Sequence, residues 1–312
     1  MAKIGIALGS GSAKGWAHIG VFKALEQLGI KPDVVAGCSI GAFVGAAYAT
    51  GNLSKLEHWV NGFSNWDLVS MMDISWRRGG LMSGEKVFEH AKTMIGDINV
   101  EDLDIPFVAV ATDLYGGHEV WLKKGPLQDA VRASCSIPGL LSPKRLGDRY
   151  FIDGAVVNPI PVNVCRALGA DLVIAVDLYG YPEVLAVPVE AETIDIDQLN
   201  AESNDGHFKN LIGHSKDYLS EIANKFIKNQ GTQPNMFAVM STALDILEHR
   251  QKKSRLAGDP PEILLQPKVA HIGSMDFNRA PESIAAGEQA VNDIAHLIES
   301  ELLRYHLTGK SS

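Results

Sequence analysis

The chain has 312 residues, of which 46% are hydrophobic and 21% are charged, so it can bury a large core within one domain. Its formal net charge of −9 argues against nucleic-acid binding, which needs a basic surface, and against simple electrostatic docking on anionic lipid. The three cysteines, Cys38, Cys135 and Cys165, are widely spaced and form no metal-binding or disulfide pattern, which is typical of a reducing compartment.

Strands and helices are predicted to alternate through the first 178 residues. The expected strands span 3–9, 34–37, 107–112, 119–122 and 172–177. The expected helices span 17–28, 40–49, 54–63, 84–95, 127–133 and 162–168. The main strands are continuous apolar runs, which is typical of a parallel sheet that helices cover on both faces. The expected fold class is therefore α/β, with a largely parallel central sheet, helices on both faces and extra C-terminal helices.

The composition changes after residue 178. Residues 183–205 carry seven acidic side chains and no Lys or Arg, which indicates a mobile surface segment. We expect a core over 1–178, an acidic segment over 179–209, and a stretch over 210–312 that completes the same domain. That last stretch is predicted to hold helices at 211–227, 236–256 and 280–304 and a strand at 262–265.

Two segments imitate membrane-directed sequences. Residues 1–8 form a short apolar run that leads into a glycine loop, so they predict a first strand and not a signal peptide. Residues 34–54 carry no charge, but their glycines together with Ser39, Thr50 and Asn52 favour a buried strand, a turn and a close-packed helix over a membrane span. We expect a cytoplasmic protein that touches a membrane only at its periphery.

A Gly-x-Ser-x-Gly pentapeptide, Gly37-Cys38-Ser39-Ile40-Gly41, separates the second expected strand from the second helix. A strand, a sharp turn and a helix in this order form the nucleophile elbow of serine hydrolases. The glycines on either side of the serine leave room where a Cβ would collide with the neighbouring elements. The motif therefore predicts Ser39 as a nucleophile.

A second glycine loop follows the first strand, with the sequence Gly9-Ser10-Gly11-Ser12-Ala13-Lys14-Gly15. A glycine loop between a strand and a helix aims backbone amides at an anion, either a dinucleotide phosphate or the oxyanion of an ester. The dinucleotide interpretation expects Gly-x-Gly-x-x-Gly and an acidic residue at the end of the second strand. This loop is one residue longer, and Asp33 lies at the start of that strand. The oxyanion interpretation uses both glycine loops, at the ends of adjacent strands.

A serine nucleophile needs a base, and ten histidines are present. His18, His271 and His296 are the candidates by position, but none has a distinctive setting, and a structural role is favoured for each. The alternative is Asp153, which follows an apolar run and precedes Gly154. This segment alone fits a catalytic carboxylate and an ordinary Asp-Gly turn equally well.

The ordered blocks Gly9–Gly20, Gly37–Gly41 and Asp153-Gly154-Ala155 resemble the patatin-like phospholipases, and most closely the bacterial RssA-type branch related to neuropathy target esterase. Further support comes from the segments at 132–139 and 158–161, and the resemblance covers about residues 3–178. The resemblance implies a dyad in which Ser39 is the nucleophile and Asp153 is the base. It also implies an oxyanion hole in the loop Gly9–Gly15, built on the amides around Gly11, Ser12 and Ala13, with Lys14 at the helix start.

The chain departs from the family pattern at Ser10 and Ser12, where many members carry glycine, and at Ala155, where some do. Backbone donors depend little on the side chain, so these changes are expected to shape the pocket more than the chemistry. The resemblance implies a serine acyl-ester hydrolase active in lipid degradation, of phospholipase, lysophospholipase or esterase type, without metal or cofactor. The alternative is a regulatory binding protein on a hydrolase scaffold. Neither specifies an oligomeric state.

An acyl group needs an apolar cleft. Residues 59–82 are rich in adaptable apolar side chains, namely Trp59, Phe63, Trp66, Leu68, Val69, Met71, Met72, Ile74, Trp76, Leu81 and Met82. They could form an acyl channel or an interfacial patch, although packing on the core is the favoured interpretation for most of them. The expected helix at 211–227 raises the same choice between a lid and core packing.

Overall fold

The computed structural model describes residues 2–63, 80–180 and 236–308. The expected helix at 211–227, the expected acidic segment from residue 181 onward and the apolar residues between Trp66 and Trp76 lie outside the described residues. The chain divides into one compact unit made of Met1–Pro182 and Met240–Ser312 and a second unit made of Glu183–Val239. The first unit contains the sheet and the site, and the description below concerns it.

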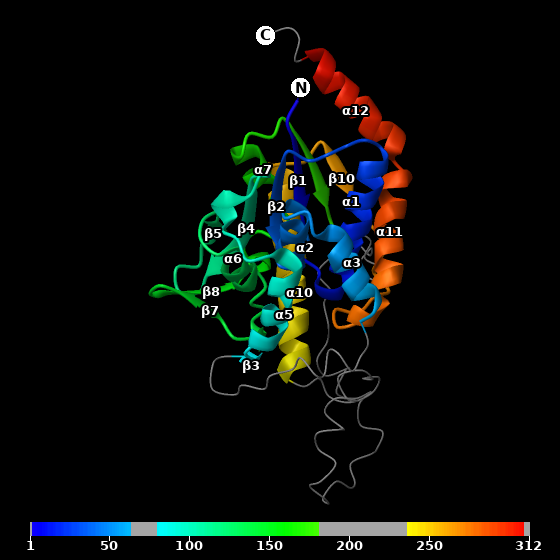
Figure 1. The fold of residues 1–312 in the computed structure, drawn as a ribbon. Coiled ribbons are helices and arrows are strands. Elements are labelled where there is room, and N and C mark those ends of the chain that lie inside the picture. The colour runs from blue at the N-terminus through cyan, green and yellow to red at the C-terminus, as the bar shows by residue number, and fades with distance from the viewer. Residues whose placement is uncertain (1, 64–79, 181–235, 309–312) are drawn as a thin grey trace, which may run out of the picture. The chain divides into compact units, whose positions relative to one another are not determined.

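The described residues form an eight-stranded sheet in the order β10-β9-β1-β2-β4-β8-β7, with β5 also paired to β4 (Figure 1). The strands are β1 (Ile4–Leu8), β2 (Val34–Cys38), β4 (Phe107–Asp113), β5 (Glu119–Leu122), β7 (Lys144–Leu146), β8 (Arg149–Asp153), β9 (Leu172–Val176) and β10 (Ile263–Leu265). The five strands from β10 to β4 are parallel. Strands β5 and β8 pair antiparallel with β4, and β7 pairs antiparallel with β8. A separate pair joins β3 (Gly80–Met82) to β6 (Gly139–Leu141).

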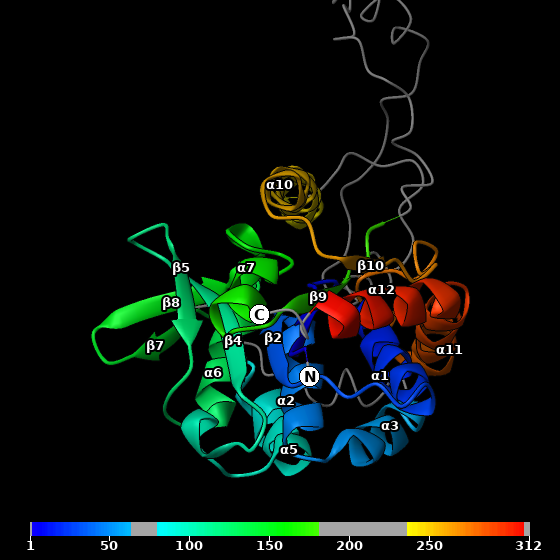
Figure 2. The ribbon, with the colours of Figure 1, turned by 90° about the horizontal axis from the view of Figure 1, so that it is seen from above.

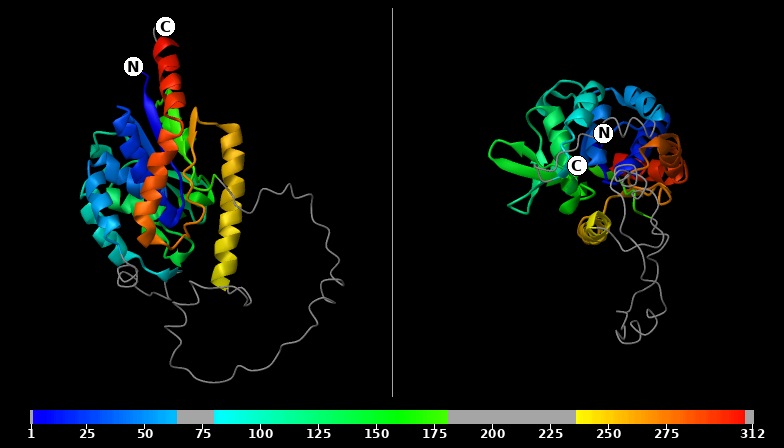
Figure 3. Two further views of the ribbon diagram at one scale, coloured as in Figure 1. Left: turned by 90° about the vertical axis from the view of Figure 1, so that its right-hand side faces the viewer. Right: turned by 90° about the horizontal axis from the view of Figure 1, so that it is seen from below.

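Helices cover both faces of the sheet, which confirms the expected α/β class. They are α1 (Ala17–Gln27), α2 (Ile40–Ala49), α3 (Leu53–Asn61), α5 (Glu85–Ile95), α6 (Leu127–Ser134), α7 (Val162–Ala167), α10 (Met236–Gly258), α11 (Ala280–Asn292) and α12 (Ala295–Thr308). Figure 2 shows α1, α2, α3, α5, α6 and α11 on one face and α7 and α10 on the other. The side view in Figure 3 shows the same separation.

Both faces of the central strands are buried. Ile6 and Leu8 of β1 belong to the core under α1 and α2, whereas Ala7 packs in a second core with Val164 of α7. Successive side chains of a strand point to opposite faces, so a strand covered on both sides must be apolar at every position. This burial explains why the parallel strands appear in the sequence as continuous apolar runs.

Most element boundaries lie within two residues of those expected from the sequence, but the closing helix does not. The single helix predicted over 280–304 is two helices, α11 and α12, which are separated at Asp293 and Ile294. Asn292 and Asp293 stand at the break, and Asn and Asp are residue types that disfavour helix interiors because their side chains can compete with the helical backbone for hydrogen bonds. The uncharged stretch 34–54 folds as β2, the Ser39 turn, α2 and the first turn of α3. No helix within the described residues has both the length and the apolar character that a membrane crossing requires.

Candidate active site

Ser39 lies in the turn between β2 and α2 with a left-handed backbone, φ 56° and ψ −126°. A residue with a side chain rarely adopts this region, so the surrounding structure must hold the turn in place. The Ser39 amide donates to Ser134 Oγ at 2.9 Å, and that hydroxyl donates to the Val110 carbonyl at 2.6 Å. Ser134 belongs to the 132–139 block that supported the family resemblance, although no role was predicted for it.

The glycines that flank Ser39 are required by close packing. A Cβ on Gly37 would lie 2.5 Å from the backbone of Ala42, and one on Gly41 would lie 2.3 Å from the Leu8 carbonyl oxygen. Carbon atoms do not approach backbone atoms so closely, so both positions exclude a side chain. The contact of Gly41 with the end of β1 also brings the elbow against the glycine loop that follows Leu8.

The pairing of β4 brings Asp153 to Ser39. One edge of β4 pairs with β5, and the other edge pairs first with β2 and then with β8. Cys38 is the partner of Val110, and Asp153 is the partner of the next residue, Ala111. Because β2 and β8 meet end to end along one edge, the residue after Cys38 lies beside Asp153. No sequence motif encodes this antiparallel pairing.

Ser39 Oγ donates a hydrogen bond to Asp153 Oδ2 at 2.5 Å. The other carboxylate oxygen, Oδ1, accepts from the Ala155 amide at 2.9 Å and lies 3.9 Å from the Cys38 thiol. The carboxylate is thus fixed on one side and directed at the serine on the other. Both side chains are almost fully buried, with 5% of Ser39 and 3% of Asp153 exposed.

Burial raises the pKa of Asp153 from 3.8 to about 6, against the opposing effect of its hydrogen bonds from Ser39, Ala155 and Cys38. A carboxylate whose pKa approaches neutrality accepts a proton from a hydroxyl more readily than an exposed aspartate does. The same group is still largely ionised at pH 7. The site therefore holds a carboxylate with a raised pKa in contact with an alcohol.

Most amides of the glycine loop already have acceptors. The four pairs are Gly9 with the Val176 carbonyl at 3.1 Å, Ser10 with Pro159 at 3.0 Å, Ala13 with Ser274 at 3.2 Å and Lys14 with Gly11 at 3.2 Å. The amides of Gly11 and Ser12 have no acceptor within the described part of the chain. Both residues have positive φ, 155° and 51°, so the backbone turns sharply there. These two amides are therefore the donors that remain for an anion.

Side chains of the loop hold it against its neighbours. Ser12 Oγ donates to the Ser274 carbonyl at 2.6 Å, and Lys14 Nζ lies 4.2 Å from the centre of the Tyr179 ring. Burial lowers the pKa of Lys14. Gly15 lies against Ile40 of the elbow, where a Cβ would come within 2.2 Å of the side chain. The loop and the elbow are therefore packed on each other.

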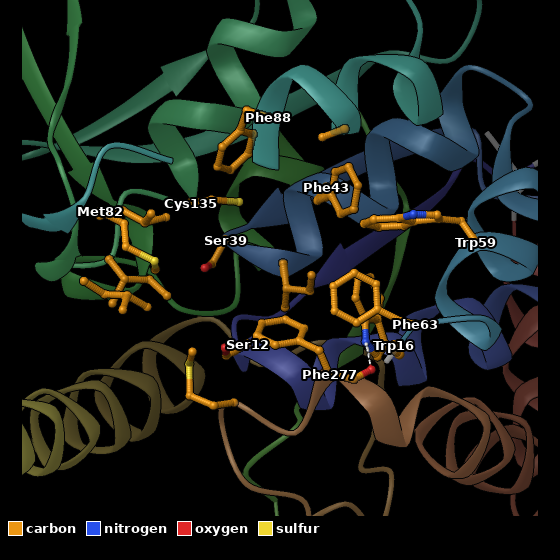
Figure 4. A pocket seen from close by; sticks show the side chains of 16 residues that line it. Ser12, Trp16, Ser39, Phe43, Trp59, Phe63, Met82, Phe88, Cys135 and Phe277 are labelled. Carbon is orange, nitrogen blue, oxygen red and sulfur yellow. Dashed lines mark hydrogen bonds between the residues drawn. The ribbon is translucent and has the colours of Figure 1, made fainter. Parts of the chain in front are cut away.

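An apolar cavity of about 140 Å³ opens beside Ser39. It is lined by Ser12, Trp16, Ser39, Ile40, Phe43, Trp59, Phe63, Met82, Phe88, Ala91, Cys135, Ile137, Leu140, Leu141, Met275 and Phe277. Figure 4 shows the Ser39 hydroxyl and Ser12 facing this space, with an aromatic group formed by Trp16, Phe43, Trp59, Phe63 and Phe277 to one side.

Three residues of the segment from which an acyl channel was expected, Trp59, Phe63 and Met82, line this cavity. The sequence reasoning missed the wall from the C-terminal part of the chain. Phe277 lies in a 3-10 helix, η4 (Phe277–Arg279), and its carbonyl accepts from Trp16 Nε1 at 3.2 Å. No motif marks Phe277, and only the fold brings it to Trp16.

The candidate histidines have other environments. His18 is fully buried, and its Nε2 lies 2.8 Å from the Gly9 carbonyl oxygen, while burial lowers its pKa to about 4. His271 pairs with Glu282 at the surface, and His296 is exposed on α12. The hydroxyl of Ser39 is instead directed at a carboxylate. The position of His18 indicates a neutral side chain that donates to the glycine loop.

The sequence matches the model of the Patatin-like phospholipase family over residues 6–166, which is more than half of the chain. An NTE family protein of Mycobacterium bovis is 32% identical, with 91% of this chain and 89% of the relative covered. Neuropathy target esterase of Drosophila melanogaster is 34% identical over 56% of this chain and 13% of its own length. Human patatin-like phospholipase domain-containing protein 6 is 32% identical over 58% and 14%. The chain therefore belongs to the patatin-like phospholipase family.

Proposed function

We propose that the protein hydrolyses acyl-lipid esters with Ser39 as the nucleophile and Asp153 as the general base. Family membership indicates an esterase- or lipase-type hydrolase of lipid esters in general. The finer assignment rests on one observation, the 2.5 Å hydrogen bond between Ser39 Oγ and Asp153 Oδ2 at the mouth of an apolar cavity. A nucleophile and a base within hydrogen-bond reach are what acyl transfer requires.

In the first step, Ser39 Oγ attacks the ester carbonyl carbon as Asp153 Oδ2 takes its proton. The carbonyl oxygen becomes an oxyanion, which the free amides of Gly11 and Ser12 receive. Each such donor stabilises the transition state by about 3 kcal/mol. The proton on Asp153 then passes to the alcohol as it leaves, and an acyl-enzyme remains on Ser39.

In the second step, water attacks the acyl-enzyme while Asp153, again ionised, removes a proton from that water. The tetrahedral oxyanion returns to the same two amides. Ser39 is then released with its proton restored by Asp153, and the fatty acid leaves. The fixed position of Asp153, held by the Ala155 amide, serves both steps without rearrangement.

The size and lining of the cavity favour the binding of a single acyl chain beside the reacting carbonyl. Its volume of about 140 Å³ is close to that of an engineered protein cavity that holds one benzene ring, so it accommodates roughly six carbon atoms. The lining is almost wholly apolar, which favours the chain end of the substrate and not its head group. Peripheral contact with a membrane and a cytoplasmic location stay predictions from the sequence.

A fluorophosphonate probe tests the proposal, because it reacts with an activated serine and not with an ordinary hydroxyl. We expect labelling of the wild-type protein, none of Ser39→Ala, and undiminished labelling of Ser54→Ala, which removes an exposed serine on α3. Hydrolysis of p-nitrophenyl esters should be lost in Ser39→Ala and retained in Ser54→Ala. A folded wild-type protein that remains unlabelled would favour the binding protein on a hydrolase scaffold.

The histidines provide the test of dyad against triad. Asp153→Asn should reduce kcat by at least about 100-fold, because a general base contributes that much or more. His271→Ala and His296→Ala remove surface side chains and should leave kcat within about twofold. A loss in either histidine variant comparable to that in Asp153→Asn would contradict the dyad.

A further inference from the structure

Helix α10 reaches the glycine loop through Glu248. The side chain of Glu248 forms a hydrogen bond with the hydroxyl of Ser10, which is itself 5% exposed. The same hydroxyl lies 3.5 Å from the Pro159 carbonyl oxygen. Ser10 immediately precedes Gly11, whose amide is one of the two proposed oxyanion donors. A restraint on Ser10 is therefore a restraint on the site.

Three more polar contacts fasten α10 to the same unit. Gln251 donates to the Val157 carbonyl at 2.9 Å, Lys252 pairs with Asp177 at 3.0 Å in a nearly buried contact, and Arg255 pairs with Glu119 at 2.9 Å. Of these four contacts, that of Glu248 is the one made to the glycine loop. The other three can hold the helix in place while Glu248 is changed.

The geometry points to Glu248 as a positioning residue for ester hydrolysis: its hydrogen bond with Ser10 holds that residue in place and thereby keeps the amides of Gly11 and Ser12 aimed at the oxyanion. This inference rests on the proposed function. The contact needs the Ser10 hydroxyl, which no glycine or alanine at this position could supply.

Charged and titratable groups face Glu248 from several elements. They are Asp153 of β8, Lys14 of the glycine loop, Tyr179 after β9, and Asp245 and Lys252 on its own helix. Burial, followed by the charges of Asp153 and Asp245, raises the pKa of Glu248 to about 8 against the opposing effects of Ser10 and Lys252. The carboxyl is therefore mostly neutral at pH 7.

The two protonation states arrange the loop differently. In the structure Ser10 Oγ donates to Glu248 Oε1. A neutral Glu248 has a proton of its own to donate to Ser10 Oγ, which frees the Ser10 hydroxyl to donate to the Pro159 carbonyl. An ionised Glu248 only accepts, so the Ser10 hydroxyl turns to it and leaves Pro159. The ionised form also places a negative charge beside amides that must receive another negative charge, which opposes oxyanion formation.

A bell-shaped dependence of kcat/KM on pH, which reports groups of the free enzyme, is the expected result for the wild-type protein. The acid limb reports ionisation of Asp153 near pH 6, and the alkaline limb reports ionisation of Glu248 near pH 8. In Glu248→Gln the side chain is neutral at every pH and still donates to Ser10. That variant should keep the acid limb and the neutral-pH kcat of the wild type and lose the alkaline limb.

Removal of the contact should lower kcat and leave KM nearly unchanged. We expect Glu248→Ala and Ser10→Ala each to reduce kcat by about 10- to 100-fold, the cost of a small misplacement of catalytic groups. The double variant should be no slower than the slower single variant, because both remove one contact. The matched controls are Gln251→Ala, which weakens the docking of α10 away from the loop, and Asp245→Asn, which removes a nearby charge.

Two results would overturn the inference. One is an alkaline limb that persists in Glu248→Gln, and the other is a fall in kcat for Gln251→Ala equal to that for Glu248→Ala, which would mean that Glu248 only docks the helix. The proposed function is tested separately by fluorophosphonate labelling of Ser39. If Ser39 is labelled and the Glu248 variants match the wild type, the hydrolase stands and the positioning role fails.

Discussion

Asp153, the proposed general base, lowers the free energy of unfolding of the native protein at neutral pH. An unfolded aspartate has a pKa of 3.8, whereas burial raises that of Asp153 to about 6 in the native protein. Between these two values the native state binds more protons than the unfolded state, so the free energy of unfolding falls as the pH rises through this window. Above pH 6 the loss is complete and amounts to roughly 3 kcal/mol for a shift of about two pKa units.

Asp153→Asn should therefore stabilise the protein at neutral pH while it abolishes hydrolysis. An amide at this position still accepts from the Ala155 amide, and it carries no charge to bury. We expect the free energy of unfolding at pH 7 to rise by up to about 3 kcal/mol, and the gain to vanish at about pH 3, below both pKa values, where Asp153 is protonated in both states. Urea unfolding at pH 7 and at about pH 3 measures both values.

Ser39→Ala is the matched control for this experiment, because it also removes activity but leaves the buried carboxyl in place. Its effect on the free energy of unfolding should not show the same rise at pH 7. An Asp153→Asn variant whose stability relative to the wild type is equal at both pH values would contradict the ionisation cost.

The residues proposed to take part in the reaction differ in whether a local sequence motif identifies them. Ser39 could be predicted because the elbow needs glycines on both sides within one turn. Asp153 could be named only through the resemblance, since its segment alone fits an ordinary turn. Glu248 and Ser274 could not be predicted, because their contacts with Ser10 and Ser12 join positions more than 230 residues apart. A single acidic residue in a helix carries no signal of such a partner.

At the scale of elements, α1 and α11 approach each other backbone to backbone. A Cβ on Gly287 of α11 would lie 1.9 Å from the Ala17 carbonyl oxygen, and one on Gly20 of α1 would lie 1.9 Å from that of Ile284. Ser283 Oγ also donates to the Lys14 carbonyl at 2.8 Å. Helix α11 is thus tied both to α1 and to the glycine loop that precedes it.

Gly287→Ala should force the two helices apart. The obstructing atom is backbone and cannot turn aside, so we expect a loss of about 3 kcal/mol, the upper end for overpacking. Gly258→Ala is the control, because no atom lies within 4 Å of its Cβ position at the end of α10, and it should change stability by less than about 1 kcal/mol. Thermal unfolding of the two variants measures the difference. Equal unfolding midpoints for Gly287→Ala and Gly258→Ala would show that the packing of α11 does not depend on the Gly287 contact.

The sequence predicted the parallel part of the fold better than the rest. Continuous apolar runs predict β1, β2, β4 and β9. These strands are buried on both faces, so every position along them must be apolar. The antiparallel strands β7 and β8 are partly exposed at the sheet edge, and their pairing with β4 depends on contacts distant in sequence. The break between α11 and α12 was missed because the apolar spacing continues across Asp293. Tertiary contacts, and not local pattern, decide these features.

At the scale of the molecule, the site is assembled from both ends of the chain. The family match ends at residue 166, but Met275 and Phe277 line the cavity, and the Ser274 carbonyl accepts from both Ser12 and Ala13. Strand β10 pairs with β9 at one side of the sheet. The described residues from Met240 onward therefore complete the unit that contains the candidate site and do not form an appendage to it.

A fragment of residues 1–180 should accordingly fail to form an active enzyme. It contains Ser39, Asp153 and the glycine loop, but it exposes the apolar face of α1 that packs against α11 and leaves the Ser12 hydroxyl without its acceptor. We expect non-cooperative urea unfolding, binding of a hydrophobic dye, and no fluorophosphonate labelling, whereas the full chain unfolds cooperatively and is labelled. A fragment that unfolds cooperatively and is labelled at Ser39 as fast as the full chain would show that residues 1–180 alone suffice. In that case the C-terminal contacts with Ser10 and Ser12 would have no part in building the oxyanion site.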